Sequence, residues 1–323
     1  MQVSPNVRAV QVPETNPMHP QYTTIYLVGR DQVLTIDSGD DEDRYRWMLR
    51  GYLAATEKAE IGQAALTHFH FDHSSNIRWL CDEFGARALI SRDTAARLDG
   101  RLPSRVDDVS EGDELSPGGA VRLQVLHTPG HSPDSLCYYI EDEGVLFTGD
   151  TILGGATTSV NDLSDYMNSL RRLRNLPNLR VICPGHGPLI DNPAAYIDGY
   201  VTHREQRERE IVGQLSSGEA LTSWQIMERL YQDVDPRLRR MADRNVQSHL
   251  AKLEKEGRLT IHAGKPRLLS EAEQVQTAAA AAERAEVLRR AGEYREQDRR
   301  RALFLQENPP TEEWLEPPLY ELT

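Results

Sequence analysis

The sequence T-H-F-H-F-D-H at residues 67–73 contains four metal-binding side chains in seven positions and follows a predicted apolar strand. His68 and His70 are two residues apart, so on an extended backbone both imidazoles lie on one face while the phenylalanines point to the other. Asp72 and His73 follow, where the strand turns into a helix, and can reach a second ion beside the first. A surface cluster of histidines is the alternative, but H-x-H-x-D-H after an apolar strand is a specific metal-site pattern.

Further ligand candidates lie at the ends of later predicted strands. One strand ends in H-T-P-G-H (residues 127–131), and others end in T-G-D at Asp150 and in P-G-H-G at His186. Glycine and proline flank each candidate, which suits a backbone that turns sharply and comes close to an ion. In H-T-P-G-H the ligand candidate is His131, whereas His127 ends the strand and is expected to be structural.

Together these motifs resemble the metallo-β-lactamase fold family. The resemblance implies an α/β protein built as a four-layer αββα sandwich, with the metal site at one edge between two sheets. It assigns seven ligands. One metal is held by His68, His70 and His131, and the other is held by Asp72, His73 and His186. Both metals are bridged by Asp150. It also implies that Asp37 orients a ligand from behind the site.

Imidazole and carboxylate ligands suit zinc, and also iron or manganese. Two divalent ions about 3.5–4 Å apart can hold a water as hydroxide near neutral pH and stabilise the leaving oxygen or sulfur. We therefore expect a hydrolase that uses a metal-bound hydroxide and needs no serine or cysteine nucleophile. Asp72 is the expected catalytic residue, because it would hold the second metal and orient the hydroxide. A mononuclear iron site, as in persulfide dioxygenase relatives, is the alternative.

Composition places this site in a soluble protein. The chain has 323 residues, of which 39% are hydrophobic, which suits one large domain and something smaller. Cys81, Cys137 and Cys183 are odd in number and widely spread, which favours a reducing compartment. Cys183 is expected to be a small apolar residue that ends a strand. Since no apolar run approaches the length of a membrane span, we expect a cytoplasmic protein with no membrane partner.

The net charge of −13 is unevenly distributed. Residues 1–200 contain 17 Lys and Arg against 28 Asp and Glu, a net −11, whereas residues 201–270 contain 13 against 10, a net +3. The acidic part carries the predicted metal site, so it lacks the overall field that would attract a nucleic acid. Local basic rims remain compatible with this distribution.

The pattern predicts three parts: a catalytic domain at 1–200, a connecting helix with a winged-helix-like domain at 201–270, and a charged helical tail with a proline-rich end at 271–323. The charged run at 204–210 is predicted to lie mostly on solvated positions of the connecting helix. A small glycine-rich stretch at 151–158 is predicted to form a flexible substrate wall.

Within the winged-helix-like domain, two helices precede strands at 258–261 and 267–269, which are expected to pair with each other across a loop. Such units often bind nucleic acid, but many only pack or oligomerise, and we expect the latter here. The tail is predicted as one helix over 277–305. It is either solvated or the contact of a homodimer.

Longer motifs narrow the resemblance. G-D-T-I-L-G at 149–154, D-Y-M-N-S-L at 165–170, C-P-G-H-G at 183–187, H-R-E at 203–205 and S-H-L-A-K-L-E-K-E-G at 248–257 resemble the beta-lactamase-like protein 2 group. The resemblance implies an endoribonuclease-like phosphodiesterase acting on single-stranded RNA. Related fungal polyketide thioesterases share the arrangement, so a thioester hydrolase of the glyoxalase II or acyl-thioesterase type is the alternative.

The motif departs from this family at two positions. Many relatives have two glycines after the last histidine of the motif, where this chain has Ser74 and Ser75. The serines could cap the following helix, but they fit less easily than glycines against a closely approaching substrate.

Overall fold

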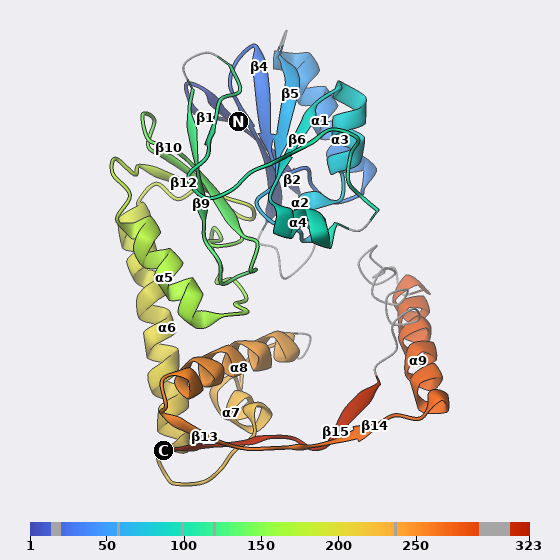
Figure 1. The fold of residues 1–323 in the computed structure, drawn as a ribbon, viewed down its shortest axis with the longest axis vertical. Coiled ribbons are helices and arrows are strands. Elements are labelled where there is room, and N and C mark those ends of the chain that lie inside the picture. Colours follow the sequence, from blue (N-terminus) through green and yellow to red (C-terminus); the bar gives the residue numbers. More distant parts are fainter. Residues whose placement is uncertain (14–20, 57–58, 99, 119–120, 236–237, 291–310) are drawn as a thin grey trace. The chain divides into compact units, whose positions relative to one another are not determined.

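The structure is a computed structural model that describes residues 1–13, 21–56, 59–98, 100–118, 121–235, 238–290 and 311–323 (Figure 1). It divides into two compact units. The first unit comprises Met1–Ile211 and Asp233–Lys252, and the second comprises Val212–Gln232 and Leu253–Thr323. Helices α6 (Pro193–Leu215) and α8 (Arg239–Lys255) each run from the first unit into the second.

A seven-stranded sheet forms one half of the first unit, with its strands in sequence order. The strands are antiparallel from β1 to β4 and parallel from β4 to β7. Their bounds are β1 (Gln2–Ser4), β2 (Val7–Pro13), β3 (Tyr22–Val28), β4 (Gln32–Ile36), β5 (Glu60–Ala65), β6 (Arg87–Ile90) and β7 (Val106–Asp108).

A five-stranded sheet forms the other half, in the order β12-β11-β10-β9-β8. Only β11 and β12 pair in parallel, and the remaining neighbours are antiparallel. Their bounds are β8 (Glu114–Leu115), β9 (Leu123–His127), β10 (Leu136–Ile140), β11 (Val145–Gly149) and β12 (Val181–Pro184).

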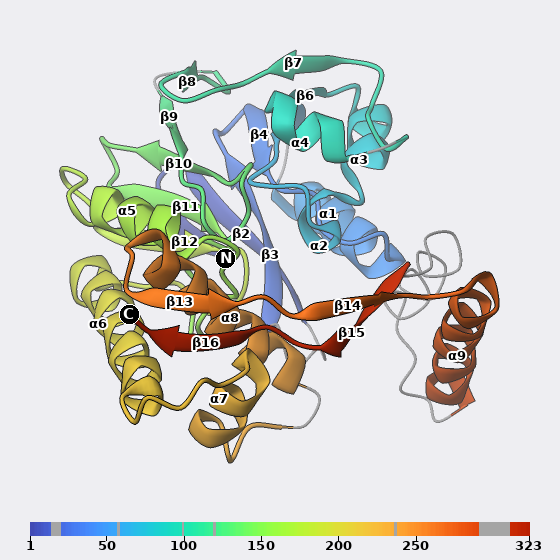
Figure 2. The same cartoon turned by 60° about the horizontal axis from the view of Figure 1, so that its bottom comes forward.

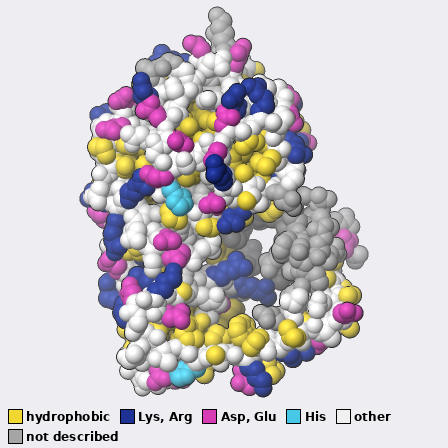
Figure 3. Space-filling model, viewed as in Figure 1, with side chains coloured by type: hydrophobic (Ala, Val, Ile, Leu, Met, Phe, Trp, Pro, Cys, Tyr) yellow, Lys and Arg dark blue, Asp and Glu magenta, His cyan; other side chains and the backbone are white. Residues whose placement is uncertain are grey.

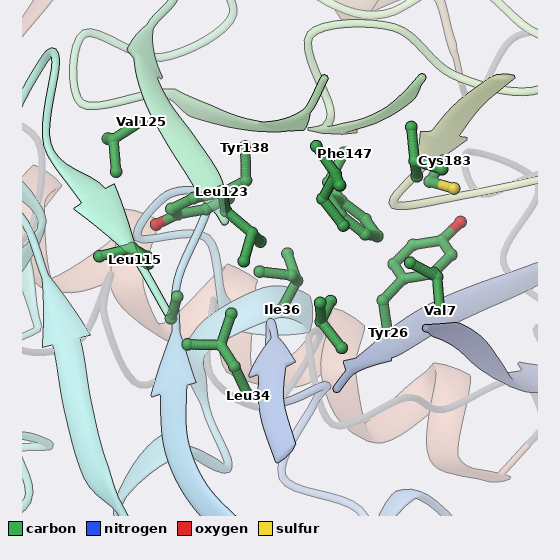
Figure 4. Close-up of a cluster of buried hydrophobic side chains, with 14 of the residues drawn as sticks. Val7, Tyr26, Leu34, Ile36, Leu115, Leu123, Val125, Tyr138, Phe147 and Cys183 are labelled. Carbon is green, nitrogen blue, oxygen red and sulfur yellow. The ribbon is translucent and has the colours of Figure 1, made fainter. Parts of the chain in front are cut away.

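The two sheets pack face to face through apolar side chains, which point toward one another in Figure 4. Tyr26 of the first sheet meets Phe147 of the second edge to face, with ring centroids 5.2 Å apart. Alternation along each strand sends every second side chain into this layer and the others outward. The core therefore fixes the distance between the loops at the sheet edges.

Helices cover the outer faces of both sheets. The first sheet packs against α1 (Asp43–Thr56) and α3 (Ile77–Phe84), whose Leu49 and Leu80 are fully buried. The short helices α2 (Phe71–Ser74) and α4 (Arg92–Arg97) follow β5 and β6. The second sheet packs against α5 (Leu163–Arg174) and the first part of α6, through Leu170 and Ile197 among others. The predicted four-layer αββα sandwich is confirmed.

The second unit contains most of the predicted winged-helix elements, whereas residues 239–252 of α8 belong to the first unit. Helix α7 (Ser223–Leu230) begins with a capping box between Thr222 and Gln225. The strands after α8 are β13 (Leu259–His262) and β14 (Lys265–Leu268). They are followed by α9 (Glu271–Arg290), β15 (Glu312–Glu316) and β16 (Leu319–Leu322).

The predicted pairing of the two wing strands with each other is wrong. Strand β13 pairs with β16 and β14 pairs with β15, both antiparallel, as Figure 2 shows. A Cβ at Gly264 would lie 2.6 Å from Glu316 O and 2.7 Å from Pro318 N, so the link between β15 and β16 passes directly over this glycine. The end of the tail thus completes the wing, which the periodicity of either segment alone does not reveal.

The tail is predicted from the sequence to be one helix over 277–305. Helix α9 accounts for the first part of this range, and residues 291–310 lie outside the described residues. Among the helices in the described parts of the chain, none is long and apolar enough to cross a membrane.

Candidate metal centre

Seven side chains meet at one edge of the first unit, where loops leave β5, β9, β11 and β12. Their ligand atoms form two groups, within each of which all atoms lie within 4.8 Å of one another. The first group is His68, His70, His131 and Asp150, and the second is Asp72, His73, Asp150 and His186. These are the seven residues that the resemblance assigns, divided as it implies and with Asp150 shared.

The first group brings three imidazoles together around one point. His70 Nδ1 lies 2.9 Å from His68 Nε2 and 3.1 Å from His131 Nε2. Asp150 Oδ2 lies 3.7 Å from His131 Nε2. Nitrogens bound to one tetrahedral ion at about 2.0–2.1 Å are separated by roughly 3.4 Å, so these spacings suit a single ion.

The second group combines two imidazoles and two carboxylates. His186 Nε2 lies 3.2 Å from His73 Nε2 and 3.0 Å from Asp72 Oδ2. Asp150 Oδ1 lies 3.2 Å from His73 Nε2 and 3.4 Å from His186 Nε2. The two oxygens of Asp150 therefore face different groups, as a bridging carboxylate would.

The histidines are oriented by contacts on the side away from the two groups. Four of the five use Nδ1 for these contacts, which leaves Nε2 directed into the site; only His70 directs Nδ1 inward. The outer contacts are His68 with Thr67 Oγ1 at 3.0 Å, His73 with Asp37 Oδ2 at 2.7 Å, His186 with Thr23 Oγ1 at 3.0 Å, and His131 with Ser159 O and Thr158 Oγ1, both at 2.9 Å. Such contacts select the tautomer and hold the ring in the orientation that binding requires.

Asp37 lies directly behind the second group. It is 3% exposed and has a left-handed backbone with φ of 64°, an uncommon conformation for a residue other than glycine. Its Oδ2 contacts His73, and its Oδ1 accepts a hydrogen bond from Thr67 N at 2.7 Å. One carboxylate thus joins the start of the motif to its last histidine.

Charge and burial favour the binding forms of His68, His70 and Asp150, whereas His73 is favoured in its protonated form and would release a proton to a cation. Burial lowers the pKa of His68 well below its usual range, and burial followed by His131 lowers that of His70 to about 4. Burial would raise the pKa of Asp150, but the nearby histidines His186 and His73 outweigh it and hold that pKa well below its usual range. For His73, burial alone would lower the pKa, but the three surrounding carboxylates raise it well above its usual value. Neutral imidazoles and ionised carboxylates are the forms that hold a divalent cation.

Two further observations test whether a metal fits here. Asp150 Oδ1 is buried and accepts no hydrogen bond from the described residues. A buried oxygen without a partner is costly, and a cation bound beside it would remove that cost. Gly185 passes close behind the second group, and a Cβ added there would lie 2.5 Å from His73 Cε1 and 3.1 Å from Asp150 Oδ1. Both the donor chemistry and the packing fit a pair of divalent cations.

The remaining predicted residues lie outside the two groups. His127 directs Nε2 to Pro133 O at 2.9 Å. Cys183 is fully buried between the sheets, and this burial raises the pKa of its thiol. The helix cap that Ser74 and Ser75 could provide is not formed, because α3 begins after Asn76, whose side chain makes no capping bond.

Sequence reasoning missed a buried aspartate that holds the motif in place. Asp134 is 1% exposed and accepts hydrogen bonds from Phe69 N at 3.0 Å and Thr94 Oγ1 at 2.7 Å. It follows His131 by three residues, in H-S-P-D, and only its polarity beside an apolar strand could have marked it. It ties the loop after β9 to the motif after β5.

A fold of two packed sheets with a carboxylate-bridged pair of histidine groups at their edge defines a class of metal-dependent hydrolases. The family model of the metallo-beta-lactamase superfamily matches residues 19–186, and a model of the beta-lactamase associated winged helix domain matches residues 222–265. The chain belongs to the metallo-beta-lactamase superfamily and is a hydrolase of that superfamily.

Individual proteins are similar to this chain over most of its length. A beta-lactamase-like protein 2 homolog from Caenorhabditis elegans is 36% identical over 239 residues, covering 73% of this chain and 80% of the relative. An atrochrysone carboxyl ACP thioesterase from Aspergillus fumigatus is 36% identical over 213 residues, covering 64% of each chain. A metallo-beta-lactamase family protein from Thermus thermophilus shares the fold, with a TM-score of 0.68 at 24% identity, over 80% of this chain and 96% of that one.

Proposed function

We propose that this protein is an endoribonuclease-like phosphodiesterase that cleaves single-stranded RNA with two divalent cations, zinc being the expected metal. His68, His70 and His131 would hold one cation and Asp72, His73 and His186 the other, with Asp150 shared. When bound, the cations would make a water nucleophilic near neutral pH and polarise the phosphodiester.

Asp72 is the proposed catalytic residue of the chain itself. Its Oδ2 contacts His186 Nε2 at 3.0 Å, while its side chain remains 12% exposed, more than the imidazoles of the second group. A carboxylate has two oxygens, so Asp72 can hold a cation with one and accept the proton of an attacking water with the other. Asp37 supports this arrangement by fixing the neighbouring His73.

The observation that carries the RNA substrate is an arginine–aromatic rim beside the site, formed by Phe69, Phe71, Arg97 and Arg101. Phe71 lies between His70 and Asp72 in the chain and is 46% exposed. The guanidinium of Arg101 lies 4.6 Å from its ring centroid, and that of Arg97 lies 5.5 Å from the ring of Phe69. Unpaired bases stack on such aromatic and guanidinium planes, with a gain of about 1–3 kcal/mol per base, and arginines attract the phosphates.

The net charge of the chain does not oppose this proposal locally. On the face shown in Figure 3, Lys and Arg side chains are interspersed with Asp and Glu side chains. Beside the site, the rim itself supplies two arginines, Arg97 and Arg101, although residues 1–200 are acidic as a whole.

A thioester hydrolase is the second candidate. The Aspergillus fumigatus relative is named as a thioesterase, and it is 36% identical to this chain. A small thioester needs no polyanion-binding surface, which suits the net −11 of residues 1–200. The same cations and the same Asp72 would serve this reaction.

One zinc-loaded preparation tested on single-stranded RNA and on an acyl thioester, across a salt series, separates the candidates. RNA cleavage is expected to weaken steeply as salt rises, because several phosphates are neutralised on binding, whereas thioester turnover should barely respond. Phe71→Ala is expected to raise KM for RNA about tenfold through the lost stacking. Trp47→Ala, at an exposed aromatic of α1, is the matched control. Thioester turnover without RNA cleavage at low salt would reverse the assignment.

We also propose a cytoplasmic location, which is supported by three free cysteines.

We further propose a homodimer that is formed through α9. Val275 of this helix is 67% exposed and would lie within such a contact. Val275→Glu should lower the mass in light scattering from dimer to monomer, and an unchanged mass would remove α9 from the contact.

A further inference from the structure

The loop that follows Asp150 supports the metal centre from one side. His131 Nδ1 contacts Ser159 O and Thr158 Oγ1, both at 2.9 Å, near the end of this loop. At its start, Tyr166 of α5 donates a hydrogen bond to Thr151 O at 2.7 Å. The position of this loop therefore affects both His131, in the first group, and Asp150, which the two groups share.

Helix α6 holds the loop with three side chains spaced four residues apart, which places them on one face of the helix. Tyr196 OH donates to Leu153 O at 2.9 Å and accepts from Gly155 N at 2.8 Å. Tyr200 OH accepts from Leu153 N at 3.0 Å. The predicted flexible wall at 151–158 is thus a loop fixed by hydrogen bonds to α6, and Leu153 is itself buried.

Arg204 is the third member of this face, and it is an exception to the prediction that the charged run at 204–210 lies mostly on solvated positions. It is 3% exposed, its Nη2 donates to Thr158 O, and its guanidinium lies 5.5 Å from the ring centroid of Tyr166. Its Nε has no hydrogen-bond partner, and no carboxylate of the described residues forms an ion pair with it. Burying a cation without an ion-pair partner is costly, so its contacts with Thr158 and Tyr166 must offset that cost.

We propose that Arg204 is a positioning residue for the metal centre, acting through Thr158 on His131. Its guanidinium fixes the Thr158 carbonyl, the Thr158 hydroxyl contacts His131 Nδ1, and His131 Nε2 faces His70 Nδ1 at 3.1 Å. The inference rests on the proposed metal binding. It goes beyond the matched family model, which ends at residue 186, because it adds a part of α6 to the metal centre.

Cobalt binding tests the inference without a substrate. The apoprotein is titrated with Co²⁺, and the visible absorbance of the bound ions gives their number and affinities. Arg204→Met keeps the length of the side chain and removes its donors, and it should weaken one of two Co²⁺ ions about 10- to 100-fold, as is typical when an outer contact of a ligand is lost. Arg204→Lys should recover part of the affinity, and Arg209→Met, at an exposed arginine of the same helix that bonds Gln206, should match the wild type.

Thr158→Val provides a second route to the same answer. It retains the carbonyl that Arg204 holds but removes the hydroxyl that contacts His131. It should weaken the same Co²⁺ ion, and the double variant should lose less than the product of the two single effects, because both act through one path. Unchanged Co²⁺ affinity in Thr158→Val overturns the inference even where Arg204→Met does not fold. Absence of RNA cleavage, by contrast, would overturn only the proposed substrate.

Discussion

Gly185→Ala is expected to disable the second group of the metal centre while leaving the fold intact. The added Cβ would lie 2.5 Å from His73 Cε1. Carbon atoms in contact are ordinarily about 3.5–4.0 Å apart, so His73 must move by about 1 Å or more. It cannot do so freely, because it is fully buried and its Nδ1 is held by Asp37 at 2.7 Å. The backbone of Gly185 is not in the left-handed region, so alanine itself causes no strain there.

A displacement of about 1 Å at a ligand costs on the order of 10²-fold in rate. We expect Gly185→Ala to bind about one metal ion per chain instead of two, measured by elemental analysis, and to lose about 10²-fold in kcat/KM. Gly51→Ala in α1 is the matched control, since a Cβ there meets nothing within 4 Å. Full occupancy by two metals together with wild-type activity in Gly185→Ala would refute the packing argument.

Three further outcomes follow from the structure. Asp72→Asn should lower kcat on the order of 10²-fold or more, since ligand charge and water orientation are lost together; activity that survives this change would remove Asp72 from the chemistry. Burial, followed by the nearby cations, lowers the pKa of His249 to about 3. Below pH 6.5 the unfolded chain therefore binds a proton that the folded chain excludes. The free energy of unfolding consequently falls as the pH falls. The unfolding free energy from urea denaturation should therefore fall about 1.4 kcal/mol per pH unit more steeply in the wild type than in His249→Leu between pH 6 and 4, and parallel slopes would contradict this account. A chain ending at residue 310 lacks β15 and β16, so β13 and β14 lose their partners, and limited proteolysis should cut at residues 259–268 while the full chain resists; equal resistance would count against the role of the tail in the wing.

The sequence was most informative where the chemistry of a side chain and its local position point the same way. His68 and His70 follow a strand, and His186 follows a strand and a proline–glycine pair, so residue type and turn residues together mark the loops of one sheet edge. The alternation of apolar residues marked the strands for the same reason, since a period of two needs no knowledge of the partner strand. These features are local, and the structure brings the seven predicted ligands together in two groups.

Partners distant in the chain were beyond this reasoning. The residues of β13 read as a strand, but the choice of β16 as its partner depends on contacts about 60 positions away, such as Leu259 opposite Leu322. Arg204 lies in a charged helical run in which neighbouring side chains are exposed, and its own burial comes from the loop that packs over it. Neither the pairing of an isolated strand nor the burial of one arginine is encoded in a local period.

The departure from the family at Ser74 has a structural reason that bears on the substrate. Ser74 is fully buried, its hydroxyl donates to Phe69 O at 2.8 Å, and it accepts a hydrogen bond from Arg101 Nη1 at 3.0 Å. A glycine at this position has no hydroxyl and could make neither bond. The serine thus fixes the guanidinium that lies over Phe71, so the residue that departs from the glycine pattern is part of the support for the arginine–aromatic rim. A rim held in place before the substrate arrives would lose less side-chain entropy on binding, which supports the proposed stacking of an RNA base on it.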